Sequence, residues 1–90
     1  MEVGFHTVQT LSMTARDEIL AVLPAVRART GRDTFTPQEV IDELQRQGTG
    51  YKPSTIRTHI VSRMCANAPD NHARTYDDLE RVTDGQYRRR

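Results

Sequence analysis

Residues Thr36–Arg63, with the sequence TPQEVIDELQRQGTGYKPSTIRTHIVSR, decide the fold because they read as two short helices joined by a turn. The first helix begins with a complete capping box, in which Thr36 is the cap, a proline follows it and Glu39 stands three residues on. Gly48 is expected to end this helix near Gln47. Its core-facing residues are Val40, Ile41 and Leu44. The stretch therefore predicts a compact helix followed directly by a turn.

The second helix of this stretch is expected to start at a cap on Ser54, to run to about Ala66 and to stop before Pro69. Its apolar sector, at about 100° per residue, is expected to face the core. That sector contains Ile56, Ile60 and Met64, with Val61 at its edge. The opposite sector has no acidic residue and contains Thr55, Thr58, His59, Ser62, Arg63 and Ala66.

An earlier helix is predicted from about Thr14 to Arg29, with Thr14 and Asp17 as an approximate capping box and Gly31 as its stop. Its apolar stripe consists of Ile19, Val22, Leu23 and Val26. Pro24 interrupts this pattern, so we expect it either to kink the helix or to end its first half.

A short strand and a hairpin complete the pattern. Residues Asp33–Thr36 favour one strand segment, and Asp84-Gly85 is a tight-turn signal between strands Leu79–Val82 and Gln86–Arg89. Tyr87 is expected to pack inward and Arg88 outward. The order helix, strand, helix, helix, hairpin predicts a mainly α chain with a small β-hairpin, an α+β fold of the winged helix-turn-helix layout.

Length and composition limit what the chain can be. We expect a flexible leader at residues 1–12 and one domain at residues 13–90, with one modest core. No apolar run is long enough to span a membrane, and the start of the chain does not resemble a secretory signal. A single cysteine, Cys65, fits a reduced cytoplasmic setting and a small core residue.

The sequence predicts no enzyme, metal site or cofactor. The spacing of His59, Cys65 and His72 matches no zinc motif, and no glycine-rich phosphate loop occurs. Asp77 and Asp78 could suggest a metal carboxylate pair, but one or the other more plausibly neutralises a nearby arginine.

Charge is distributed unevenly. Residues 1–51 have a net charge of −2 and residues 52–90 a net charge of +3, which together give the overall +1. A basic half favours a phosphate-binding face, although an ordinary solvated surface with an arginine-rich end would have the same charge.

The acid-free sector of the last helix is suited to the DNA major groove, since a carboxylate there would repel phosphate. Threonine methyl groups can contact the C5 groups of thymine or cytosine, and His59 and Arg63 can donate to guanine. Lys52 and Ser54 at the helix start are suited to a phosphate. The alternative is a bundle helix whose polar face only meets solvent.

Further basic residues surround this helix. Arg57 lies between core positions, so its guanidinium is expected to reach either an acid of the domain or a flanking phosphate. His72 and Arg74 follow the helix and have either a DNA-contacting or a merely solvated role. The basic residues of the hairpin are Arg81, Arg88, Arg89 and Arg90. They are expected to contact the minor groove or backbone as a wing, unless the last of them form a fraying end.

From Phe35 onward the chain resembles winged helix-turn-helix domains, and more narrowly a bacterial family of uncharacterised small domains. The residues that carry this resemblance are Phe35–Val40, Tyr51–Ile60, Ser62–Cys65, Asn71-His72 and Tyr76–Val82. The resemblance implies the fold and nucleic-acid binding, and associates such domains with restriction or nuclease-containing chains.

These observations lead to one functional expectation. The chain is expected to be a non-catalytic, cytoplasmic module that binds double-stranded DNA, as a regulator or as the target-recognition part of a restriction or defence system. Sensing of modified cytosine is compatible with its threonine-rich face. Its expected partners are DNA, a second copy or a larger nuclease-containing protein, and no membrane. The alternative is a winged-helix module for protein–protein interaction.

Overall fold

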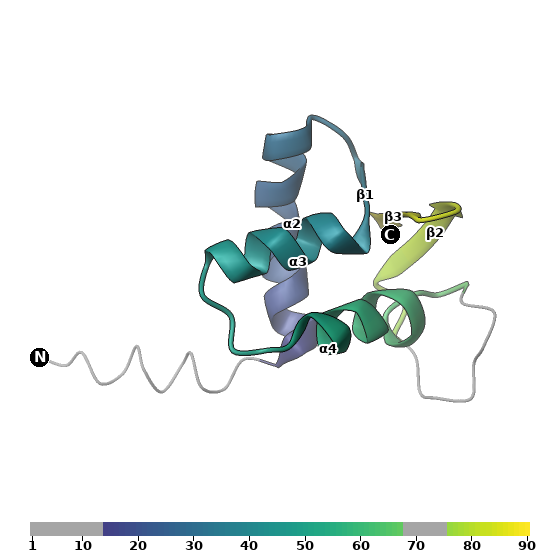
Figure 1. The fold of residues 1–90 in the computed structure, drawn as a ribbon. Coiled ribbons are helices and arrows are strands. Elements are labelled where there is room, and N and C mark those ends of the chain that lie inside the picture. The colour runs from purple at the N-terminus through teal and green to yellow at the C-terminus, as the bar shows by residue number, and fades with distance from the viewer. Residues whose placement is uncertain (1–13, 68–75) are drawn as a thin grey trace, which may run out of the picture.

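The computed structural model describes residues 14–67 and 76–90, which form a small α+β domain (Figure 1). The elements are α2 (Ala15–Thr30), β1 (Thr34–Phe35), α3 (Pro37–Arg46), α4 (Pro53–Thr58), the π-helical segment η1 (His59–Arg63), β2 (Leu79–Thr83) and β3 (Gln86–Arg89). This order confirms the predicted succession of helix, strand, helix, helix and hairpin. The expected leader at residues 1–12 lies outside the described residues.

Helix α2 has the predicted caps. The Thr14 hydroxyl accepts from the Asp17 amide at 3.1 Å, and the Asp17 carboxylate accepts from the Thr14 amide at 3.4 Å. Gly31 ends the helix with φ of 74°, a left-handed conformation that favours glycine. Pro24 lies inside the helix, which continues to Thr30, so the alternative in which Pro24 ends the first half of the helix is wrong.

Helix α3 also begins and ends as predicted. The Thr36 hydroxyl accepts from the Glu39 amide at 3.1 Å, while the Glu39 carboxylate accepts from the Thr36 amide at 2.9 Å. The helix ends at Arg46, with Gln47 as its C-terminal cap. The buried apolar residues of α2, α3 and α4 form one core with Phe35, Leu79 and Tyr87.

The three strands form an antiparallel sheet in the order β1-β3-β2. Phe35 pairs with Tyr87, and their ring centroids lie 6.4 Å apart inside the core. Gly85 closes the hairpin with φ of 78°. As predicted, Tyr87 is buried and Arg88 is exposed, because successive side chains of a strand point to opposite faces.

Leu79 joins the hairpin to the end of the preceding helical segment by two backbone hydrogen bonds. The Leu79 amide donates to the Met64 carbonyl at 2.9 Å, and the Leu79 carbonyl accepts from the Ala66 amide at 2.8 Å. Leu79 therefore forms a parallel bridge with Cys65 while it pairs with Arg89 in the sheet. The Leu79 side chain is fully buried, so this junction is part of the core.

The predicted bounds of the last helix require correction. Pro53 occupies the first helical position, so Lys52 is the cap residue, and the predicted cap at Ser54 is wrong. The regular helix widens into η1, where the Met64 amide donates to the His59 carbonyl at 2.8 Å. Helical structure ends at Arg63, short of the predicted end at Ala66, because the Ala66 amide bonds to Leu79 instead.

Acidic groups hold the helices and the hairpin together at two places. Asp78 accepts from Arg16 Nε at 2.7 Å and from Arg16 Nη2 at 2.8 Å, which confirms the expectation that one of the two neighbouring aspartates neutralises an arginine. The Arg16 guanidinium also stands over the Tyr76 ring, 4.2 Å from its centroid. These contacts tie the start of α2 to the chain that enters β2.

Glu43 on α3 is the second acidic residue that connects elements of the domain, and it is only 6% exposed. Its carboxylate accepts from Arg46 at 2.9 Å, from Gln47 at 3.2 Å and from Arg29 of α2 at 3.0 Å. These bonds, first that from Arg46, lower the pKa of Glu43 to about 2. The cluster therefore joins α2 to α3 through a carboxylate that stays ionised in acid.

We predict that Glu43 makes the domain acid-sensitive. Because its folded-state pKa lies below its ordinary value of 4.5, its stabilising contribution is complete above pH 4.5 and is lost as the pH falls through about 2. Glu43→Gln should lower the melting temperature at pH 7 by several degrees and flatten its dependence on pH between 4.5 and 2. Thermal melts followed by circular dichroism measure both effects.

The matched control is Asp42→Asn, an exposed neighbour on α3 whose carboxylate accepts from Gln38. It should leave the melting curve close to that of the parent chain. A Glu43→Gln variant with the parent's pH dependence would contradict this account.

Candidate nucleic-acid interface

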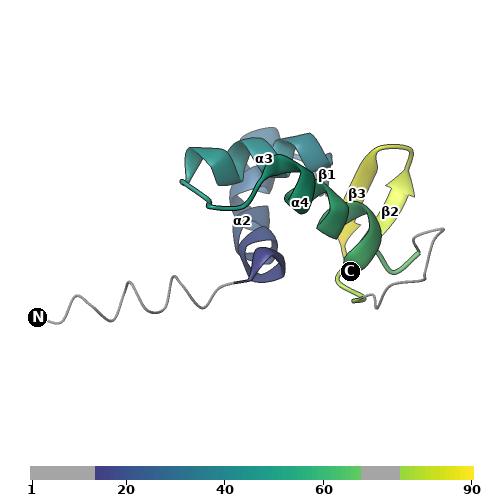
Figure 2. The ribbon, with the colours of Figure 1, turned by 60° about the horizontal axis from the view of Figure 1, so that its bottom comes forward.

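Burial of one side of α4 and η1 in the core determines which side is the exposed outer face. Ile56 and Ile60 are fully buried, so the opposite side of the helix faces solvent (Figure 2). The exposed residues of this face, with its leading cap, are Lys52, Ser54, Arg57, Thr58, Val61 and Arg63. Thr55, His59, Ser62 and Ala66 are only half-exposed and lie at its margins.

Val61 is the residue of this face that the sequence prediction misplaced. It was expected at the edge of the core, but its side chain is 36% exposed. The reason is geometric, since five residues after Ile56 correspond to a rotation of about 140° around the helix. An apolar side chain thus stands among the polar groups of the outer face, beside Thr58 one turn earlier.

His59 has a partner inside its own helix. Its Nδ1 lies 2.9 Å from the Thr55 carbonyl oxygen. A carbonyl oxygen only accepts, so Nδ1 carries the proton and Nε2 of the neutral ring is an acceptor. The neutral ring therefore suits an amino group, such as N4 of cytosine or N6 of adenine, rather than the guanine acceptors expected from the sequence.

We predict that the neutral His59 ring is the Nδ1-protonated tautomer. Long-range proton–nitrogen NMR spectra of the chain labelled with ¹⁵N-histidine, recorded above neutral pH, should show the proton on Nδ1 of His59. A proton on Nε2 would contradict the bond to Thr55 and restore His59 as a donor.

Arg57 takes a position that the sequence did not anticipate. Its guanidinium is exposed and donates from Nη2 to Gln38 Oε1 at 2.8 Å, and Gln38 in turn donates to Asp42 at 2.9 Å. The expected pairing with an acid of the domain is therefore wrong, because the guanidinium bonds to a side-chain amide on α3. This bond aligns Arg57 with the start of α3 and leaves its other N–H groups directed to solvent.

The two ends of the face are cationic. Lys52 stands at the start of α4 and Arg63 at the end of η1, and the segment between them contains no acid. Neither of these cations has an ion-pair partner among residues 14–67 and 76–90. Their charges are thus available to an anion that approaches the face.

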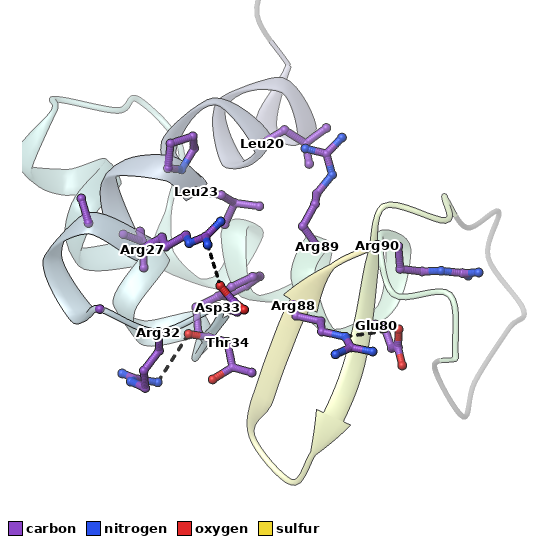
Figure 3. Close-up of a pocket in the computed structure, with 15 residues that line it drawn as sticks. Leu20, Leu23, Arg27, Arg32, Asp33, Thr34, Glu80, Arg88, Arg89 and Arg90 are labelled. Carbon is purple, nitrogen blue, oxygen red and sulfur yellow. Dashed lines mark hydrogen bonds and ion pairs between the residues drawn. The ribbon is translucent and has the colours of Figure 1, made fainter.

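The hairpin divides its arginines between two sides. Arg88 pairs with Glu80 on one face of the hairpin, 3.6 Å away. Arg81 is the register partner of Tyr87, so it lies on the other face, and it is 3.9 Å from Asp84 at the turn. Arg89 follows Arg88 on the strand and points the other way, toward Leu20 of α2 (Figure 3). The arginines at the end of the chain therefore do not form one basic row. His72 and Arg74, which were also expected to contact DNA, lie outside the described residues.

Three observations on residues 14–67 and 76–90 concern other kinds of site. Cys65 is buried, in agreement with its predicted core position. Within that part, no group of His, Cys, Asp and Glu side chains is arranged to hold a metal ion. None of the described helices has the length and apolar character needed to cross a membrane.

Residues 20–89 match the model of a protein family described as a domain of unknown function, DUF7669. The chain belongs to this family. The match extends from α2 to β3 and includes the whole of α4 and η1. No curated protein and no solved structure matches the chain significantly.

Proposed function

We propose that this DUF7669 domain is a non-catalytic module that binds double-stranded DNA as a winged helix-turn-helix. Segments α4 and η1 would enter the major groove, and the hairpin would lie against the adjacent backbone or minor groove. The observation that carries the proposal is the outer face of α4 and η1, which is acid-free, cationic at both ends and joined to the hairpin through Leu79.

The dimensions of this face support groove binding. Lys52 and Arg63 are separated by about 16 Å along a helix with a rise of about 1.5 Å per residue. The major groove is about 12 Å wide, so cations at the two ends of the helix can contact phosphates on both of its sides. Solvent-exposed Ser54, Arg57 and Thr58 lie between them and can approach base edges.

The hairpin adds a second contact. Arg81 and Arg88 are exposed, and their ion pairs with Asp84 and Glu80 are long, at 3.9 and 3.6 Å. Exposed pairs of this kind stabilise a protein by less than about 1 kcal/mol, so a phosphate can replace the carboxylate at little cost. We therefore assign Arg81 and Arg88 to the wing and leave Arg89, which faces α2, out of it.

We predict that binding depends steeply on salt and that the end cations account for part of this dependence. Lys52→Ala and Arg63→Ala should each weaken binding to every duplex and reduce the slope of log K against log[salt] by about 1. Arg27→Ala removes the same charge from the exposed side of α2 and should change neither quantity by as much. Fluorescence anisotropy with a labelled duplex, from low to moderate salt, measures these slopes.

Absence of binding at low salt would overturn the proposal. A slope that changes equally for Arg27→Ala and Arg63→Ala would also overturn it, since the attraction would then be a property of net charge rather than of this face.

The apolar groups of this face, on Thr58 and Val61, suggest which chemical group of a base it would contact. Thr58 and Val61 are both exposed, and residues three apart on a helix are neighbours on its surface. A thymine or 5-methylcytosine methyl is the group in the major groove that their methyl groups could bury. Burial of one methylene-sized group contributes about 0.8 kcal/mol, or about fourfold in affinity.

We predict that the chain prefers duplexes with cytosine methylated at C5, and that Val61→Ser reduces this preference by about fourfold or more. Selection from random duplexes with and without 5-methylcytosine identifies the sequence, and competition binding measures the ratio. Ala21→Ser, an exposed change on α2, is the control and should keep the preference. A ratio that Val61→Ser leaves unchanged would exclude Val61 from methyl recognition.

The biological setting we propose is that of a cytoplasmic regulator or of the target-recognition part of a restriction or defence system. As partners besides DNA we propose a second copy of the chain or a larger nuclease-containing protein, and in a restriction system the latter would supply the cleavage.

A further inference from the structure

An open groove of about 1110 Å³ lies between α2 and the end of β3 (Figure 3). The described residues that line it come from α2, from the chain that links α2 to β1, from β1 and from the hairpin. None of them belongs to α3, α4 or η1, so the groove is separate from the outer face of α4 and η1. Arg88, which we assign to the wing, also lies on its rim.

The floor of the groove is apolar. Leu23 and Phe35 present the little surface that the core leaves exposed, and Leu20, Pro24 and Ala28 extend this surface along α2. Pro24 and Ala28 are exposed although they lie on the same helix as the buried stripe. An apolar surface of this kind gains free energy when another apolar side chain covers it.

The rim of the groove is strongly cationic. Arg27, Arg32, Arg88, Arg89 and Arg90 all line it, against only Asp33 and Glu80. Arg27 is neutralised by Asp33 at 3.0 Å and Arg88 by Glu80 at 3.6 Å, while Arg32 pairs with Glu39 outside the groove. Arg89 and Arg90 have no ion pair with any described residue.

The apolar floor and the cationic rim together favour one class of binding partner over the others. Two copies joined symmetrically through the groove would bring two copies of the same cationic rim together, and like charges disfavour such contact. Nucleic acid would satisfy the arginines but leave the apolar floor without a matching surface. A peptide segment with apolar side chains beside carboxylates satisfies both.

We propose that the groove binds a short segment of a partner protein in which Leu, Ile, Phe or Met residues are flanked by Asp or Glu. The apolar side chains would cover Leu20, Leu23 and Ala28, and the carboxylates would pair with Arg89 and Arg90. The proposed contacts use no residue of α4 or η1, so the groove would attach the domain to another protein while that face stays free.

The test begins with selection of displayed random 12-residue peptides on the full chain. The proposal predicts enrichment of sequences with apolar residues beside Asp or Glu. Fluorescence anisotropy with one enriched peptide should then show at least tenfold weaker binding to Ala28→Glu, which adds bulk and negative charge to the groove, and to Arg89→Glu. The Arg89→Glu variant should regain affinity for the same peptide with one acid replaced by lysine.

Matched variants separate the groove from general effects. Ala21→Glu adds the same charge at an exposed position of α2 that does not line the groove, and Arg63→Ala lies on the DNA face; both should bind the peptide like the parent chain. Circular dichroism checks that each variant is folded.

Three results would overturn the proposal. One is the absence of enriched acidic–apolar peptides, and another is equal loss of binding in Ala21→Glu and Ala28→Glu. The third is a concentration-dependent dimer, seen by sedimentation, that Ala28→Glu abolishes, since a second copy would then be the occupant. Each leaves the DNA proposal intact, because Ala28→Glu is not expected to change duplex affinity.

Discussion

The backbone pairing of Leu79 is the constraint on which the arrangement of this domain depends. Its amide and carbonyl bond to Met64 and Ala66 at the end of the helical segment, while the same residue pairs with Arg89 in the sheet. The side chain of Leu79 is fully buried, so these backbone hydrogen bonds lie beside the core. Breaking one there would leave a buried donor or acceptor without a partner, which costs free energy. The helix end and the hairpin are therefore held as one unit rather than as two elements joined by a long connection.

This junction accounts for the shape of the outer face. The chain has to leave the helix before Cys65 to pair with Leu79, and the wide turn of η1 brings both Met64 and Cys65 into the core. Arg63, one residue earlier, is left exposed at the end of the face. π-Helical turns are uncommon and occur often at functional sites, which agrees with the role proposed for this segment.

Local signals in the sequence predicted most of the fold, because capping boxes, Pro37, Gly31 and the Asp84-Gly85 turn act within a few residues. What the sequence could not supply depends on distant partners. The end of the last helix is fixed by Leu79, and the groove beside Arg89 depends on the pairing of β3 with β1, a strand far earlier in the sequence. Two errors were avoidable: Pro53 already implied a cap at Lys52, and the helical angle already placed Val61 outside.

Hydrogen exchange of the full chain with a pool of random-sequence duplexes at low salt tests the central claim most directly. The account predicts slower amide exchange on addition of DNA in peptides that cover residues 52–63 and in the hairpin, with α2 unchanged around Pro24 and Ala28. Protection confined to α2, or no change anywhere at a concentration that saturates binding, would contradict the assignment of the α4–η1 face as the surface that contacts DNA.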